Sequence, residues 1–181
     1  MKIKLIALTL AFSMSAIGVY AQKAPDFSGK WTLDVAKSKL GERNNIETQT
    51  LTVTQTANDI KVDTATKRTA PPAGAPGGGG GGGGRMGGGD GAATYMLDGK
   101  DVKSEVPGPG GNTVPVTTNS KVDGGKLVLS SSRTFTTPNG PITATSKETW
   151  ELSSDGKTLT VITERTSPRG TDTTTKVFVK G

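Results

Sequence analysis

The chain has 181 residues, with 22 Lys and Arg residues against 16 Asp and Glu residues, and its net charge at pH 7 is +6. It contains no cysteine and no histidine, which excludes disulfides, thiol nucleophiles, histidine-dependent serine triads, haem ligation by His or Cys, and ordinary zinc or copper sites. The basic residues alternate with acidic ones instead of forming a basic patch interleaved with aromatics, so we expect no nucleic-acid partner.

Residues 1–21 have the form of a secretory signal peptide. Lys2 and Lys4 precede an apolar run from Leu5 to Phe12, and small residues lead to Ala21, the expected cleavage site. The apolar run is shorter than the roughly 20 residues that a bilayer-spanning helix needs, so we expect cleavage and no membrane insertion of the mature chain. Because no lipoprotein cysteine follows the cleavage site, the mature protein is predicted to be periplasmic or secreted.

Short runs rich in Thr, Val and Ile, separated by turn signals, predict a single all-β domain over residues 22–181. The first strand is expected at 26–33, followed by a turn or short helix that Asp34 caps and Gly41 ends. The remaining strands are predicted at 47–55, 59–67, 93–97, 101–106, 113–122, 126–136, 142–152, 158–166 and 171–180. Asx-Gly pairs in the turns permit the positive φ that tight hairpins require, so we expect each strand to pair antiparallel with the next.

A Pro/Gly-rich segment at 69–92 interrupts this series. Half of the 26 glycines lie between Gly74 and Gly91, and such a run gains too little from burial to offset the entropy of ordering it. We therefore expect a flexible, disordered insertion in one domain; a linker between two domains is the alternative. A phosphate-binding loop would need Lys and then Ser or Thr after the glycines, whereas Arg85 and Met86 follow the longest run.

An open row of hairpin-linked strands would expose two unpaired edges, and closing the sheet removes them. The predicted fold is therefore an antiparallel up-and-down β-barrel of about eight to ten strands. A barrel that crosses an outer membrane would carry an apolar outer band flanked by aromatic residues. Aromatic residues make up only 4% of this chain, which favours the soluble form.

Phe27, Gly29, Trp31 and Leu33 alternate along the first predicted strand and share one face. We expect this face to point into the barrel, where Trp31 would fill one end and Gly29 would let a neighbouring group approach closely.

The stretch F-S-G-K-W-T-L at residues 27–33 resembles the F-x-G-x-W-x-L opening of the calycin superfamily, which includes lipocalins and intracellular fatty-acid-binding proteins. Exported bacterial lipocalin-like proteins open in a similar way. The strand series, the block W-E-L-S-S-D-G-K-T-L-T-V at 150–161 and the last strand at 175–180 are similar to the fatty-acid-binding proteins. The resemblance implies a barrel that binds a small molecule in its interior.

In the fatty-acid binders, an arginine on a late strand and an R-x-Y pair on the last strand hold the ligand's carboxylate. Here the late-strand position falls at Trp150, and the last strand offers Lys176 and Phe178. Arg133 and Arg165 could supply a guanidinium, although an arginine on a strand more often faces outward.

The sequence thus predicts an exported soluble barrel that binds a small hydrophobic or amphipathic molecule in its interior. The candidate ligand-binding residues are Trp31, Phe135, Trp150, Lys176 and Phe178, with Lys176 as a polar anchor. We expect no enzyme, metal or cofactor, because most acids lie in turns, and Glu148 and Glu151 fall on opposite faces of a strand. The alternative is a structural or partner-binding envelope protein with a solid barrel core; an interior cavity of about 300 Å³ or more distinguishes the two.

Overall fold

The structure is a computed structural model that describes residues 25–41, 44–69, 90–107, 112–137, 140–168 and 170–181. This part of the chain forms ten β-strands and no helix. The strands are β1 (Gly29–Leu33), β2 (Ile46–Gln55), β3 (Asp59–Arg68), β4 (Gly91–Met96), β5 (Val102–Pro107), β6 (Thr113–Asp123), β7 (Lys126–Thr137), β8 (Gly140–Leu152), β9 (Thr158–Ser167) and β10 (Gly170–Lys180). Each predicted strand is confirmed. The predicted signal peptide, residues 1–21, and residues 70–89 of the predicted insertion lie outside the described residues.

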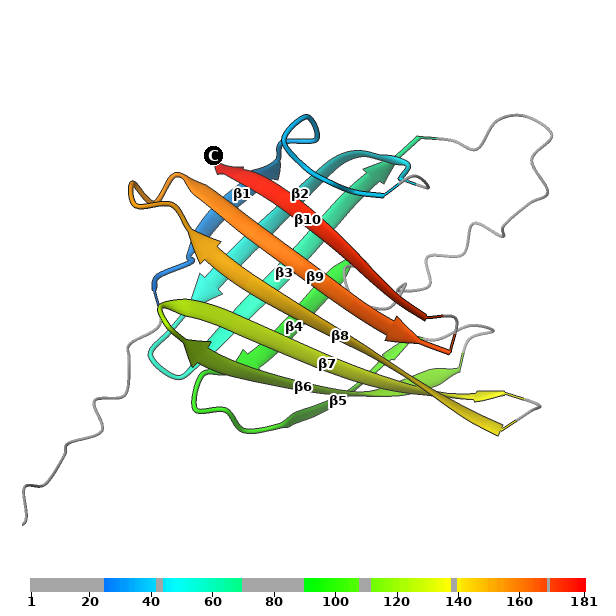
Figure 1. The fold of residues 1–181 in the computed structure, drawn as a ribbon. Helices are drawn as coiled ribbons and strands as arrows, with labels where there is room; N and C mark the ends of the chain where they lie inside the picture. The colour runs from blue at the N-terminus through cyan, green and yellow to red at the C-terminus, as the bar shows by residue number, and fades with distance from the viewer. Residues whose placement is uncertain (1–24, 42–43, 70–89, 108–111, 138–139, 169) are drawn as a thin grey trace, which may run out of the picture.

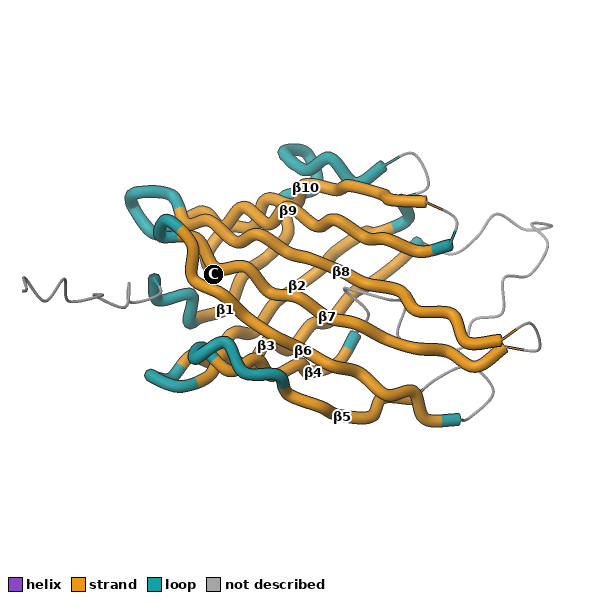
Figure 2. The backbone as a smooth tube through the Cα atoms, turned by 60° about the horizontal axis from the view of Figure 1, so that its bottom comes forward, coloured by secondary structure: helices purple, strands orange, loops and turns teal. Residues whose placement is uncertain are grey.

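The ten strands form one antiparallel sheet in the order β4-β3-β2-β1-β10-β9-β8-β7-β6-β5. The first and last strands pair with each other, with Trp31 opposite Lys180. The sheet curls until β4 approaches β5 and β6, which gives a nearly closed up-and-down barrel (Figures 1 and 2). This confirms the predicted fold class.

The expectation that every strand pairs with the next is wrong at one place, because β4 and β5 have no ladder between them. Two side chains of β6 bind main-chain oxygens of β4 instead: Thr118 Oγ1 donates to the carbonyl of Thr94 at 2.8 Å, and Ser120 Oγ donates to that of Met96 at 2.6 Å. These two bonds link β4 to β6 at the place where the sheet has its two ends. We call this boundary of the barrel the β4–β5 gap.

One end of the barrel, which we call the floor, holds the turns after β2, β4, β6 and β8 and is packed with large side chains. Phe27, Trp31 and Leu33 are buried there, as the alternation on the first strand predicts. Trp31 Nε1 donates to the carbonyl of Phe27 at 2.8 Å, and the ring of Phe27 meets that of Trp150 edge-on with centroids 5.7 Å apart. Gly29 has a φ of +131°, and a Cβ there would lie 3.0 Å from Cε of Lys180. The close approach predicted at this glycine is therefore present.

The segment after β1 forms a turn and no helix. Asp34 accepts a hydrogen bond from the amide of Lys37 at 3.2 Å, and Lys39 forms a bridge with Thr175 of β10. Asp34 therefore caps the turn as predicted. The chain then runs beside β10 before it enters β2, because the bridge at Lys39 holds it there.

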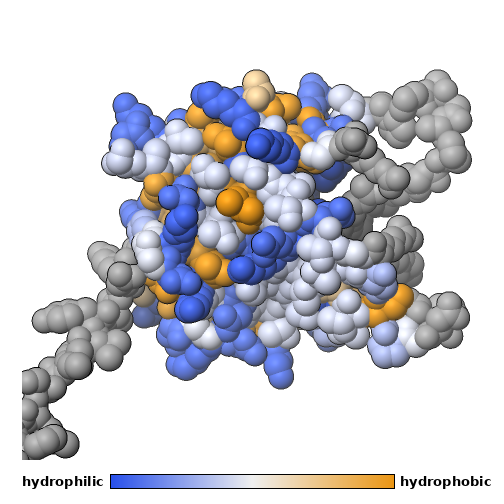
Figure 3. All heavy atoms as spheres, viewed as in Figure 1, coloured by the Kyte–Doolittle hydropathy of each residue, from blue (hydrophilic) through white to orange (hydrophobic). Residues whose placement is uncertain are grey.

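The outer surface of the barrel is largely polar. On the face shown in Figure 3, hydrophilic side chains predominate and apolar ones are scattered. Ion pairs cross between neighbouring strands, for example Lys126 with Glu151 at 2.8 Å and Lys147 with Glu164 at 3.4 Å. No helix of a length and apolarity suited to crossing a bilayer occurs in the described part of the chain.

Candidate functional site

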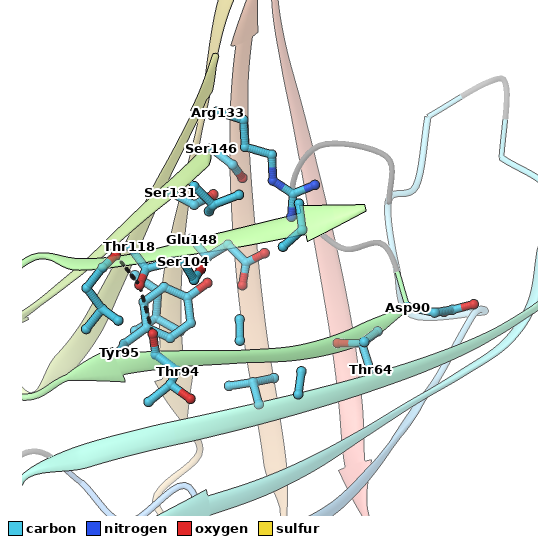
Figure 4. Close-up of a pocket in the computed structure, with 18 of the residues that line it drawn as sticks. Thr64, Asp90, Thr94, Tyr95, Ser104, Thr118, Ser131, Arg133, Ser146 and Glu148 are labelled. Atoms are coloured by element: carbon cyan, nitrogen blue, oxygen red, sulfur yellow. Dashed lines mark hydrogen bonds between the residues drawn. The ribbon is translucent and has the colours of Figure 1, made fainter. Parts of the chain in front are cut away.

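A cavity of about 520 Å³ lies inside the barrel next to the β4–β5 gap. Its walls come from β3 to β8, so it occupies one side of the interior (Figure 4). The volume exceeds the roughly 300 Å³ that distinguishes a ligand cavity from ordinary packing defects. The barrel is therefore solid at its floor and hollow beside the gap.

Both apolar and polar side chains line the cavity. Its apolar part includes Val62, Val116, Leu129 and Trp150. Its polar part comprises Thr64, Asp90, Thr94, Tyr95, Ser104, Glu105, Thr118, Ser131, Arg133, Ser146 and Glu148. A molecule that fills this space would meet both hydrocarbon surface and hydroxyl or charged groups.

The polar side chains form a continuous row across three strands. Ser146 of β8 lies directly opposite Ser131 of β7 and directly opposite Arg165 of β9. Residues that are opposite in an antiparallel ladder lie on the same face of the sheet. Ser146 is buried at 5% exposure and lines the cavity, so its side chain lies on the inner face of the sheet. Ser131 and Arg165, which lie opposite it, are on the same inner face.

Arg133 belongs to the same face, two residues along β7 from Ser131, and it lines the cavity. The expectation that Arg133 and Arg165 face outward is therefore wrong. The alternation from Leu127 and Leu129, both buried, carries Arg133 inward. Burial lowers the pKa of both guanidinium groups, which remain charged because an arginine keeps its proton under physiological conditions.

Glu148 places a carboxylate beside these cations. Its Oε2 accepts a hydrogen bond from Nε1 of Trp150 at 2.9 Å. Tyr95 projects into the same space from β4 (Figure 4), and burial, together with the negative charge of Glu148, raises the pKa of the Tyr95 phenol above its ordinary value of 10. Glu151, on the opposite face of β8, pairs with Lys126 outside. The prediction that the two glutamates do not converge is confirmed.

Lys176 is a further interior cation, on β10. Its side chain is buried at 8% exposure, on the same face of the strand as the buried Phe178. Burial lowers the pKa of Lys176 to about 8, Glu148 opposes this by raising it, and Arg165 and Arg68 lower it further. No carboxylate of the described residues lies within 4.0 Å of its Nζ.

The five sequence-predicted site residues occupy different places. Trp150 lines the cavity. Trp31 and Phe178 belong to the packed floor, Lys176 is buried on the inner face, and Phe135 is half-buried near the end of β7. Whether any of the five contacts a ligand stays a prediction.

Sequence reasoning missed Tyr95, Arg133, Ser146 and Glu148 as cavity residues. The signal for three of them is register: the tight hairpin that pairs Asp123 with Lys126 also pairs Val122 with Leu127. Leu127 is apolar and faces inward, and counting alternate residues from it places Arg133 inside. The pairing of β7 with β8 then places Ser146 and Glu148 on the same inner face. Tyr95 has no such signal, because the alternation in β4 is weak.

No family model matches the chain, and no curated protein is similar to it in sequence. The structure is similar to that of a zebrafish ileal bile-acid-binding protein complexed with cholic acid, at 16% identity and a TM-score of 0.48, covering 86% of this chain and 98% of that one. It is also similar to a mutant of the REP1-NXSQ fatty acid transporter, at 13% identity and a TM-score of 0.47, with the same coverage of 86% and 98%.

The fold is an antiparallel up-and-down β-barrel. Ten antiparallel strands follow one another in chain order around a nearly closed barrel, with the ends of the sheet at β4 and β5, and this confirms the fold that the opening motif implies. At the identities and TM-scores found, the two similar structures say nothing about what this chain binds. We therefore infer its ligand from its own residues.

Proposed function

We propose that the protein is an exported soluble barrel that binds a small amphipathic molecule in its interior. The observation that carries this proposal is the cavity of about 520 Å³ beside the β4–β5 gap, which lies in the range of about 300–1,000 Å³ typical of small-molecule sites. Val62, Val116 and Leu129 offer it an apolar wall, and burial against that wall contributes about 25 cal/mol per Å².

A structural barrel with a solid core is the second candidate, and the packed floor supports it. Phe27, Trp31, Leu127, Leu159 and Phe178 are buried at 1% exposure or less, so half of the interior has no room for a ligand. The floor alone, however, gives no reason for the opposite half to enclose polar groups around an open space. A ligand-binding barrel therefore explains both the packed floor and the cavity, whereas a solid scaffold explains the packed floor alone.

Native mass spectrometry of the gently purified mature chain tests the proposal directly. We expect a discrete additional mass that disappears after organic extraction. For the extracted protein, 1-anilinonaphthalene-8-sulfonate is a suitable probe, because it combines an aromatic body with one anionic group. Its fluorescence should rise with a saturable, one-to-one dependence on protein concentration.

A cavity-filling variant identifies the place of binding. Ala93 lines the cavity from β4, and Ala93→Phe should remove binding of the probe. Ala65→Phe is the matched control, because Ala65 is exposed on β3, and it should bind as the unmodified protein does. Equal binding by both variants, or no retained mass together with no probe binding, would favour the solid scaffold.

A further inference from the structure

The inner face of the barrel beside the cavity carries more positive than negative charge among its buried and half-buried groups. In the part of the chain that the structure describes, the charged groups on the inner face that are buried or half-buried are Arg133, Arg165 and Lys176 and one carboxylate, Glu148. These are three positive charges against one negative charge, or a net +2. Charges that are held away from water are costly unless a partner neutralises them. Among the described residues, the cluster thus holds one negative charge for three positive charges.

The other charged groups nearby do not alter this balance. Arg68 of β3 and Asp172 of β10 lie at the far end of the barrel, are exposed to solvent and have opposite signs. Asp90 and Glu105 are exposed and line the cavity, and Asp90 lies apart from Arg133 in Figure 4. Solvent screens these exposed carboxylates, so they do not neutralise the buried cations.

Hydrogen-bonding groups stand unused in the same wall. Ser146 Oγ is buried, lines the cavity and has no hydrogen-bond partner among the described residues. The Nε of Arg165, on the residue opposite Ser146, is likewise buried without such a partner. A buried polar atom that lacks a partner costs free energy, so both groups favour a ligand that brings acceptor oxygens.

We propose that Arg133, Ser131 and Ser146, with Arg165 beside them on β9, form an anion subsite for a dianionic head group of the phosphomonoester class. This rests on the proposed function, since it assigns the polar end of the molecule that the cavity holds. A phosphate monoester carries about −1.5 to −2 charges at pH 7 and three acceptor oxygens. It therefore matches both the net +2 of the buried and half-buried groups on the inner face and the unpartnered Ser146 Oγ and Arg165 Nε, whereas a carboxylate or sulfate ester supplies one charge.

The subsite differs from the arrangement implied by the resemblance to fatty-acid binders. The late-strand position there corresponds to Trp150, whose Nε1 is used by Glu148 at 2.9 Å, and the last strand has no phenol at Phe178. The guanidinium groups of this chain project from β7 and β9 instead. The cations of the proposed subsite thus lie on other strands than in the fatty-acid binders, and the proposed head group is a dianion instead of a carboxylate.

Three amphiphiles with the same tail separate the charge of the head group from its shape. Decyl phosphate, decyl sulfate and decanoate are titrated as competitors of 1-anilinonaphthalene-8-sulfonate at pH 7.5. The sulfate and phosphate are both tetrahedral, but only the phosphate is a dianion. We expect decyl phosphate to bind at least about ten-fold more tightly than either of the others, the difference that one additional charge-assisted contact produces.

Lowering the pH to 5 leaves the phosphate monoester with one charge, because its second pKa is about 6. The ten-fold preference over decyl sulfate should then largely disappear. Equal affinity of the three amphiphiles at pH 7.5 would overturn the assignment of a dianion subsite while leaving an interior amphiphile site in place. Absence of binding by all three and by the probe would overturn the proposed function itself.

Variants place the subsite on the wall. Arg133→Met and Arg165→Met should each reduce the preference for phosphate over sulfate by about ten-fold, because each removes a charge and a bidentate donor. Lys147→Met is the matched control: Lys147 is exposed on the outer face of β8, and this variant should keep the full preference. If the arginine variants fold and retain the preference, the subsite lies elsewhere; if they do not fold, the amphiphile series on the unmodified chain still decides the class of head group.

Discussion

Replacing Lys176 by Met should stabilise the protein near neutral pH and abolish a rise in stability between pH 8 and pH 10. The pKa of Lys176 is about 8 in the folded chain, against 10.5 for an ordinary lysine. Below pH 8 both the folded and the unfolded chain hold the proton, and the folded chain carries the full cost of a buried ammonium. Above pH 8 the folded chain releases the proton while the unfolded chain keeps it, so the free energy of unfolding rises with pH.

The size of the effect follows from the difference between the two pKa values, 10.5 and about 8. One pKa unit corresponds to about 1.4 kcal/mol, so the cost below pH 8 is about 3 kcal/mol. Tyr95 limits the window at its upper end: its pKa is raised by burial, so above pH 10 the unfolded chain loses a phenolic proton that the folded chain retains. Between pH 8 and 10 we therefore expect a gain of about 2–3 kcal/mol, followed by a decline.

Urea denaturation at pH 7, 8, 9 and 10, followed by tryptophan fluorescence, measures this dependence. Met is unbranched and of similar length, but it has no charge to desolvate, so Lys176→Met should give a higher free energy of unfolding at pH 7 and a flat profile up to pH 10. Lys147→Met, on the outer face, should keep the rise seen in the unmodified protein. A flat profile in the unmodified protein, or an equal rise in Lys176→Met, would refute the claim that Lys176 is buried as a charge.

Two further substitutions test the contacts that close the barrel. Gln55→Ala removes a side chain that accepts a hydrogen bond from the amide of Phe27 at 3.0 Å and donates one to the carbonyl of Pro25 at 2.9 Å. The free energy of unfolding in urea should fall by about 1–2 kcal/mol. An unchanged midpoint of the urea transition would mean that these bonds add nothing to stability. Thr118→Val keeps the shape of the side chain but removes the hydroxyl that donates to the Thr94 carbonyl. Hydrogen exchange of the amides in β4 and β5 should therefore accelerate, while that in β9 and β10 stays the same. Equal acceleration in all four strands would contradict a local role for this hydrogen bond.

The sequence was sufficient to predict the strands because the signals for them are local. Gly124 and Gly125 form the turn that sets the pairing of β6 with β7, and Gly156 has a φ of +66° in the turn before β9. Such turns occur wherever glycine or Asx interrupts a β-branched run. The packed floor was also predictable, since Phe27, Trp31 and Leu33 share one face.

The cavity was harder to predict because its walls are polar. Thr and Ser occur on both faces of these strands, so hydrophobic alternation does not distinguish inside from outside at Ser131 or Ser146. Register does, and it would have placed Arg133 inside, against the general tendency of arginines on strands to face water. The β4–β5 gap was not predictable from either pattern, because it depends on bonds from Thr118 and Ser120 to carbonyls 24 residues earlier.

The division of the interior also explains how the chain tolerates its buried cations. The floor buries Trp31, Trp150, Phe27 and Phe178 almost completely, and large apolar side chains of this kind supply about 1.5–3 kcal/mol each when buried. That packing opposes the cost of about 3 kcal/mol at Lys176. A bound dianion would neutralise the cluster, raise the pKa of Lys176 towards its ordinary value and so remove the rise in stability above pH 8. Saturation with decyl phosphate should therefore flatten the pH profile of the unmodified protein, whereas a neutral decyl alcohol should leave the rise in place.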